Sequence, residues 1–178
     1  MPTEHHDERV GEVIEAFLDG PPLRARMAPR PLRRRDALRA IRQRIPLETR
    51  LDWEVALRHE DARVRRYARP ASVLVIRIEV PRPEMAEFMA GRVGEVVREH
   101  VRETDRVTRA ATDRYHVLLP ETDAVQADVM ADRIREACKD QMPGFNGSGP
   151  EVHVAPASPA EGETLLDALR AAQAAVGA

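Results

Sequence analysis

Two side chains in this sequence combine residue type and spacing in a way that suits ligand recognition. Arg102 and Asp105 stand three positions apart and offer a forked hydrogen-bond donor beside a carboxylate acceptor. Asp113 is a third polar candidate, although aspartate is also a common turn residue. The single cysteine, Cys138, lies in a helical pattern that predicts a small core residue rather than a nucleophile. The six histidines show no metal-ligand spacing, so we predict no metal site.

A predicted β-hairpin carries Asp113. Residues 105–110 and 114–119 are its strands, and a polar bend at Thr112 and Asp113 separates them. Pro120 closes the second strand. Because a helix precedes the first strand, we expect the intervening turn to present Arg102 and Asp105 at the surface.

Further helices and strands surround this hairpin. We predict helices over 47–67, 83–101, 122–140 and 161–176, and strands over 72–80 and 151–155. A hairpin between two strand–helix units is the order of a ferredoxin-like palm. The fold class is therefore predicted as α/β of the α+β sandwich type, with helices packed on a mainly antiparallel sheet.

Apolar spacing also predicts which helix faces are buried. The predicted buried sets are Leu47, Leu51 and Val55 in the first helix, Met85, Phe88, Met89, Val93, Val96 and Val97 in the second, and Val125, Val129, Ile134 and Cys138 in the third.

The chain divides into a predicted N-terminal extension, residues 1–46, and a compact domain, residues 47–178. The extension contains predicted helices at 8–18 and 34–44 around a proline-rich linker at 21–32. Residues 21–50 carry ten arginines against two acids, whereas residues 1–20 carry one arginine against six acids. The arginine-rich segment is interpreted as a solvated linker and helix, as an arm for an acidic partner, or as a counter-charge to the acidic first helix.

Composition narrows the classes of protein. A hydrophobic content of 43% supports one packed core, and no apolar run is long enough to span a membrane. The acidic N-terminus lacks the apolar region of a signal peptide, so a cytoplasmic location is expected. No aromatic residues interleave the arginines, which argues against nucleic-acid binding.

Residues 109–122 resemble the signature hairpin of the GGDEF (diguanylate cyclase) family. The five motif positions are occupied by Ala111, Thr112, Asp113, Arg114 and Tyr115. Three further segments resemble the family in the same order and spacing, namely residues 63–72, 131–135 and 165–173. The resemblance implies the family's fold from about residue 47 to the C-terminus.

The family's reaction joins two GTP molecules held by a homodimer, with Mg²⁺ clamped by carboxylates. The resemblance places Arg77 and Arg114 where the family has acids near the metal. Carboxylate remnants are Glu79, Glu95 and Asp113, and the motif glycines are replaced by Ala111 and Thr112. We therefore expect no catalytic residues, no metal and no cofactor.

The resemblance also matches Arg102 and Asp105 to the family's Arg-x-x-Asp inhibitory site, which binds cyclic di-GMP. An Arg fork suits the O6 and N7 edge of guanine, and a carboxylate accepts from its N1 and N2 side. The preferred hypothesis is an inactive regulatory or interaction module of bacterial cyclic di-GMP signalling, with a protein partner or a homodimer.

Two alternatives remain open. The first is a divergent diguanylate cyclase, or another nucleotidyl-transfer enzyme acting on GTP, that uses Glu79, Glu95 and Asp113 with Mg²⁺. The second is a structural partner domain that dimerises through its N-terminal helices.

Overall fold

The computed structural model describes residues 47–142 and 149–177. All of them belong to the second of two compact units, Ala37–Ala178. The helices and linker predicted within residues 1–46 lie outside the described residues, as does most of the loop predicted at 142–150. The domain boundary at residue 46 therefore stays a prediction.

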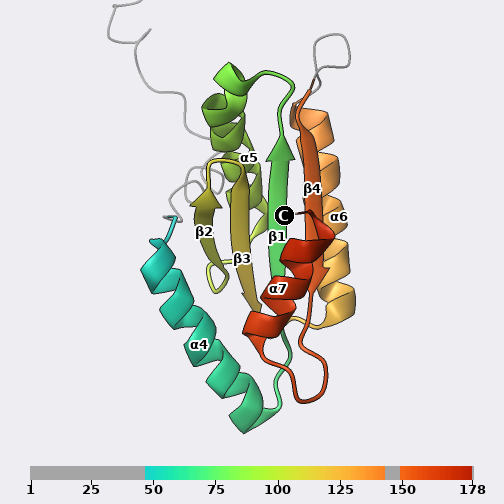
Figure 1. Ribbon diagram of the computed structural model, residues 1–178. Helices are drawn as coiled ribbons and strands as arrows, with labels where there is room; N and C mark the ends of the chain where they lie inside the picture. Colours follow the sequence, from blue (N-terminus) through green and yellow to red (C-terminus); the bar gives the residue numbers. More distant parts are fainter. Residues whose placement is uncertain (1–46, 143–148, 178) are drawn as a thin grey trace, which may run out of the picture. The chain divides into compact units, whose positions relative to one another are not determined.

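The elements follow one another in the predicted order (Figure 1). Their bounds are α4 (Arg50–Tyr67), β1 (Ala71–Glu79), a short 3₁₀ turn (Pro83–Met85), α5 (Ala86–His100), β2 (Arg106–Ala111), β3 (Arg114–Pro120), α6 (Ala124–Gln141), β4 (Glu151–Ala157) and α7 (Leu165–Ala175).

The four strands form one sheet in the order β2-β3-β1-β4, and all three pairings are antiparallel. Because β3 lies between β1 and β2, the segment β1-α5-β2 is a split β-α-β unit, and β3-α6-β4 forms another around β1. This arrangement confirms the predicted ferredoxin-like α+β sandwich.

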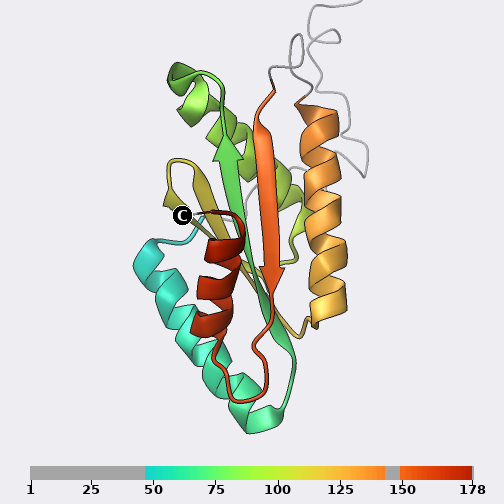
Figure 2. The ribbon, with the colours of Figure 1, turned by 45° about the vertical axis from the view of Figure 1, so that its right-hand side comes forward.

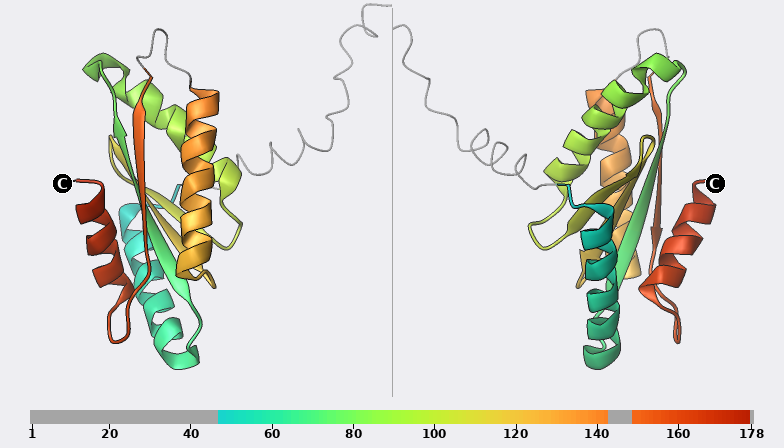
Figure 3. Two further views of the ribbon diagram at one scale, coloured as in Figure 1. Left: turned by 90° about the vertical axis from the view of Figure 1, so that its right-hand side faces the viewer. Right: turned by 60° about the vertical axis from the view of Figure 1, so that its left-hand side comes forward.

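Helices α5 and α6 cover one face of the sheet, as the edge-on view in Figure 3 shows. Strand side chains alternate between faces, so every second residue of β1 and β3 enters this core. Its strand members include Leu74, Ile76, Ile78, Tyr115, Val117 and Leu119.

Helices α4 and α7 cover the opposite face and lie on the same side of the sheet in Figures 1 and 2. Trp53 and Leu57 of α4 pack here with Leu165 and Leu169 of α7. The intervening strand residues, such as Val75, complete this second core. The two faces of the sheet thus carry separate hydrophobic cores.

Capping residues determine where the helices begin. Thr49 accepts a hydrogen bond from the backbone of Asp52 at the start of α4, and Asp123 and Thr164 form capping boxes at the starts of α6 and α7. The last helix starts later than predicted because Thr164 caps it and Gly162, with φ +84°, precedes the cap.

Several predicted core residues are exposed instead. Val125 and Val129 are 72% and 53% exposed, and Phe88 and Leu51 are also on the surface. Helix α6 buries a neighbouring stripe that contains Ala127 and Ala131, whose small side chains let the helix approach the sheet closely. Cys138 is buried in this stripe, as predicted.

Within the described residues, none of the helices combines the length and the apolar character that crossing a membrane requires.

Candidate functional site

The tip of the β2–β3 hairpin is a tight turn at Thr112 and Asp113. Neither residue has a positive φ, so the turn does not depend on glycine. The register is irregular between Arg109 and Ala111, and Ala111 pairs with Arg114 across the turn. The carbonyl oxygen of Asp113 accepts a hydrogen bond from Ile78 N at 2.8 Å, which joins the tip to the end of β1.

Arg109 ties the turn end of this hairpin to α5. Its guanidinium donates to both carboxylate oxygens of Glu87, at 2.6 and 2.8 Å, and to the carbonyl of Thr112 at 2.9 Å. The hydrogen bond from Arg109 lowers the pKa of Glu87. The position and conformation of the tip are therefore held from two sides.

Arg77 and Arg114 are direct cross-strand partners at the hairpin end of β1 and β3. Both follow the alternation that sends Val75 and Leu118 to the α4/α7 face. Arg77 forms an ion pair with Glu79, whereas the Nε atom of Arg114 is buried without a hydrogen-bond partner among the described residues. The strand ends therefore present two adjacent cations on one face.

The three carboxylate remnants are not brought together. Glu95 lies on α5 and pairs with Arg92 at 3.2 Å, and Asp113 is exposed at the hairpin tip. Across the described ranges, the grouping of His, Cys, Asp and Glu compact enough to share an ion consists of Glu79, Glu151 and His153. Glu151 and His153 of this grouping lie on β4. Nothing in the sequence indicated that they lie beside Glu79.

Gly94 has a structural reason to be glycine. A Cβ atom at this position would lie 2.7 Å from the hydroxyl oxygen of Tyr115. Tyr115 is buried, its hydroxyl donates to the carbonyl of Ala90 at 2.8 Å, and burial raises its pKa. Gly94 and Tyr115 therefore serve the packing of α5 against the sheet.

Arg102 and Asp105 meet in the turn between α5 and β2, but not as expected. Asp105 is only 2% exposed, and its Oδ2 accepts a hydrogen bond from the backbone N–H of Arg102 at 2.6 Å. Burial raises the pKa of Asp105, an effect that this hydrogen bond partly offsets. The expectation that both side chains lie at the surface is wrong for Asp105, because the short turn uses its carboxylate to satisfy a backbone donor.

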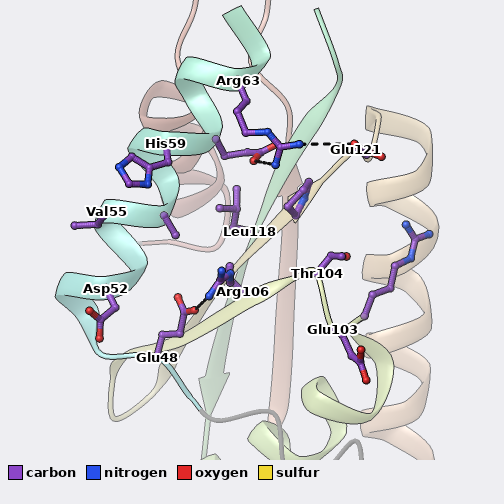
Figure 4. A pocket seen from close by; sticks show the side chains of 14 residues that line it. Glu48, Asp52, Val55, His59, Arg63, Glu103, Thr104, Arg106, Leu118 and Glu121 are labelled. Carbon is purple, nitrogen blue, oxygen red and sulfur yellow. Dashed lines mark hydrogen bonds and ion pairs between the residues drawn. The ribbon is translucent and has the colours of Figure 1, made fainter. Parts of the chain in front are cut away.

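Arg102 is among the residues that line a cavity of about 600 Å³ between α4, strands β2 and β3 and this turn. Figure 4 shows this cavity. Two other arginines of the cavity are paired with acids, Arg63 with Glu60 at 3.1 Å and Arg106 with Glu48. No ion pair involves the Arg102 guanidinium within the described part of the chain. Among the described residues, Arg102 is thus the arginine of this cavity that is available to an anionic ligand.

A second cavity, of about 560 Å³, lies between α4 and α7 and was not anticipated from the sequence. His116 and Trp53 line it, with ring centroids 5.4 Å apart. Burial, reinforced by the charges of Arg114 and Arg50, lowers the pKa of His116 to about 4. Its imidazole is therefore neutral near pH 7.

No protein-family model matches the chain, and no curated protein matches it by sequence. Solved structures do match. A diguanylate cyclase protein from Thermotoga maritima superimposes with a TM-score of 0.62 at 18% identity, covering 71% of this chain and 93% of its own.

The described domain has the GGDEF fold. An active GGEEF domain of a Vibrio cholerae diguanylate cyclase gives a TM-score of 0.62 at 15% identity, covering 70% of this chain and 85% of its own. The GGDEF domain of DgcB from Caulobacter crescentus, in complex with c-di-GMP, gives 0.58 at 14% identity, covering 73% and 83%. At these identities the GGDEF fold is established, and the chemistry must be argued from this chain's own residues.

Proposed function

We propose that this chain is a catalytically inactive GGDEF-fold module that binds cyclic di-GMP through Arg102 and the turn held by Asp105. The observation that carries the proposal is the contrast between two arginine sites. Arg77 and Arg114 are packed side by side at the hairpin end, whereas Arg102 lies unpaired, among the described residues, at a cavity.

The hairpin end does not fit the Mg²⁺ that the fold family uses. Mg²⁺ requires oxygen ligands in near-ideal octahedral geometry. Here Arg77 and Arg114 face each other across the strands, and Glu79 is already engaged by Arg77. Neither guanidinium group can ligate Mg²⁺, so we infer that the hairpin end lacks the oxygen ligands that metal-dependent nucleotidyl transfer requires.

The cavity beside Arg102 suits a small polar ligand. Its volume of about 600 Å³ falls in the range of small-molecule sites, roughly 300–1,000 Å³. An arginine fork reads the O6 and N7 edge of guanine. Asp105 holds the turn through Oδ2, and its buried Oδ1 has no partner among the described residues. Asp105 is not among the residues that line the cavity, so its proposed role is to hold the turn that positions Arg102.

A signalling domain without catalytic activity acts by associating with another protein. We therefore infer that ligand binding at Arg102 alters association with a protein partner or with a second copy of the chain.

Titration calorimetry of the full chain with cyclic di-GMP tests this proposal. We expect micromolar binding that Arg102→Ala weakens by about tenfold, since a bidentate arginine–guanine contact contributes roughly 1–3 kcal/mol. Arg133→Ala is the matched control, because Arg133 is an exposed arginine on α6 away from the cavity. An absence of heat at high micromolar ligand, or equal affinity in Arg102→Ala, would reject the site.

The enzyme alternative is tested on the same samples with GTP and either Mg²⁺ or Mn²⁺. We expect no nucleotide product. Product that appears with the unaltered chain and disappears in Asp113→Ala would show that the module is an enzyme.

A further inference from the structure

Three side chains with metal-ligand atoms converge where β1 ends beside β4, which is an edge strand. They are Glu79, Glu151 and His153, and one ligand atom from each lies within 4.8 Å of the others. Glu79 and Glu151 are direct cross-strand partners, and His153 lies two residues further along β4 on the same face. The cluster thus combines two carboxylates and an imidazole on one surface of the sheet.

The distances from the His153 ring nitrogen to the two carboxylates are too long for hydrogen bonds. The Nε2 atom of His153 lies 3.7 Å from Glu79 Oε1 and 3.7 Å from Glu151 Oε1. Hydrogen bonds from nitrogen to oxygen span about 2.7–3.2 Å, so neither separation is a hydrogen bond. Nε2 is nevertheless buried, and it has no hydrogen-bond partner among the described residues. The two carboxylates are thus within ion-pair distance of this ring nitrogen but make no hydrogen bond to it.

We propose that Glu79, Glu151 and His153 bind a divalent transition-metal ion, with Zn²⁺ as the reference ion. Zinc lies about 2.0–2.2 Å from histidine nitrogen and carboxylate oxygen, which places two ligands of a tetrahedral ion about 3.4 Å apart. The observed 3.7 Å separations need to contract by only a few tenths of an ångström. One ion would satisfy Nε2 and both carboxylates together.

The ligand set selects the class of ion. An imidazole favours zinc and its neighbours over Mg²⁺, which prefers carboxylate and water oxygens. Three protein ligands leave at least one coordination position open to water or to a further ligand. Arg77 is the cross-strand partner of His153 and contacts the Glu79 oxygen that faces His153, where it would orient this carboxylate as the hydrogen-bond donors beside metal ligands commonly do.

The ion would also relieve an electrostatic conflict. Like charges directly opposite each other on neighbouring strands are destabilising, and Glu79 and Glu151 form such a pair. Arg77 compensates one of these charges, and a divalent ion would more than offset the other and tie the edge strand β4 to β1. This site uses none of the residues proposed to bind cyclic di-GMP and stands independently of that function.

Calorimetric titration of the full chain with ZnCl₂ tests the site. His5 and His6 are first replaced by alanine, because adjacent histidines near the N-terminus could bind zinc themselves. We expect one ion per chain with micromolar affinity, and little heat from MgCl₂ at the same concentration. His153→Ala removes a metal ligand, so it should weaken zinc binding by more than the roughly 10–100-fold that follows the loss of a residue hydrogen-bonded to a ligand.

Two further variants make the test specific. Glu151→Gln removes one ligand charge at a residue whose side chain is 72% exposed, so it should weaken zinc without unfolding the chain. His59→Ala removes an exposed histidine of α4 outside the cluster and should leave the affinity unchanged. Co²⁺ provides a second readout, since its visible absorption bands should disappear in His153→Ala. Zinc affinity that is unchanged in both cluster variants, or no binding at all, overturns the proposal.

Discussion

Arginine side chains determine much of the chemistry at the hairpin end. Arg77 and Arg114 oppose each other on adjacent strands, an arrangement that costs stability unless acids compensate it. Glu79 compensates Arg77, but no ion pair joins Arg114 to an acid in the described part of the chain. Two adjacent cations therefore dominate the electrostatic potential at this end of the sheet.

Buried His116 predicts how stability depends on pH. Its pKa is about 4 in the folded chain and about 6.5 when unfolded, so the unfolded chain binds a proton at higher pH. Protonation of His116 therefore leaves the free energy of unfolding unaffected above about pH 6.5. It lowers that free energy as the pH falls from about 6.5 towards 4, and below about pH 4 it lowers it no further. Between pH 7 and pH 5 we expect the free energy of unfolding to fall by about 2 kcal/mol through His116.

Urea denaturation at several pH values measures this effect. In His116→Gln, the decrease in the free energy of unfolding between pH 7 and pH 5 should be smaller by about 2 kcal/mol. In the control His59→Gln, at an exposed histidine of α4, the decrease should equal that of the unaltered chain. Parallel pH profiles for the unaltered chain and His116→Gln would show that His116 is not held neutral.

At the scale of elements, the contact between α5 and the sheet depends on one glycine. Alanine is normally favoured over glycine within a helix by about 1 kcal/mol. At Gly94, however, the new Cβ would lie 2.7 Å from the Tyr115 hydroxyl, and Tyr115 is held by Ala90. We expect Gly94→Ala to lower the free energy of unfolding by about 1–3 kcal/mol, as overpacked core substitutions do.

Gly91 provides the matched control on the same helix. A Cβ at Gly91 meets nothing within 4 Å, so Gly91→Ala should be neutral or stabilising by up to about 1 kcal/mol. Tyr115→Phe in the Gly94→Ala background should recover part of the loss by removing the hydroxyl. Equal effects of the two glycine substitutions, measured by urea denaturation, would contradict close packing at Gly94.

The elements themselves were largely predictable because their signals are local. Strand β1 is a β-branched run, and the hairpin is two such runs around a polar bend, so both appear within about a residue of their predicted bounds. The buried face of a helix was harder to predict, because Val125 and Val129 fit helical spacing as well as the residues of α6 that are buried. Only the sheet determines that α6 turns its small residues, Ala127 and Ala131, inward.

Sites that depend on tertiary contacts were not predictable. Glu79 and His153 lie on strands that are far apart in the sequence, and their proximity follows from the register of β1 with β4. Asp105 was predicted as a surface ligand because residue type and spacing say nothing of burial. The structure instead places its carboxylate on the backbone of Arg102.

At the scale of the molecule, one sheet serves two hydrophobic cores. Trp53 belongs to the core beneath α4 and α7, and Cys138 belongs to the core beneath α5 and α6. Strands β1 and β3 contribute alternate residues to both cores, so loss of the sheet removes both. The described domain should therefore unfold as one cooperative unit.

Trp53 and Cys138 are the only tryptophan and cysteine of the chain, so each core has its own probe. Burial raises the pKa of Cys138 to about 12, which keeps the folded thiol protonated and unreactive at pH 8. We expect the urea midpoint from Trp53 fluorescence to coincide with the midpoint from brief thiol labelling of Cys138. If the α4/α7 layer were instead an independent appendage, Trp53 would report unfolding at a lower urea concentration while Cys138 remained protected, because α5, α6 and the sheet would still enclose the thiol.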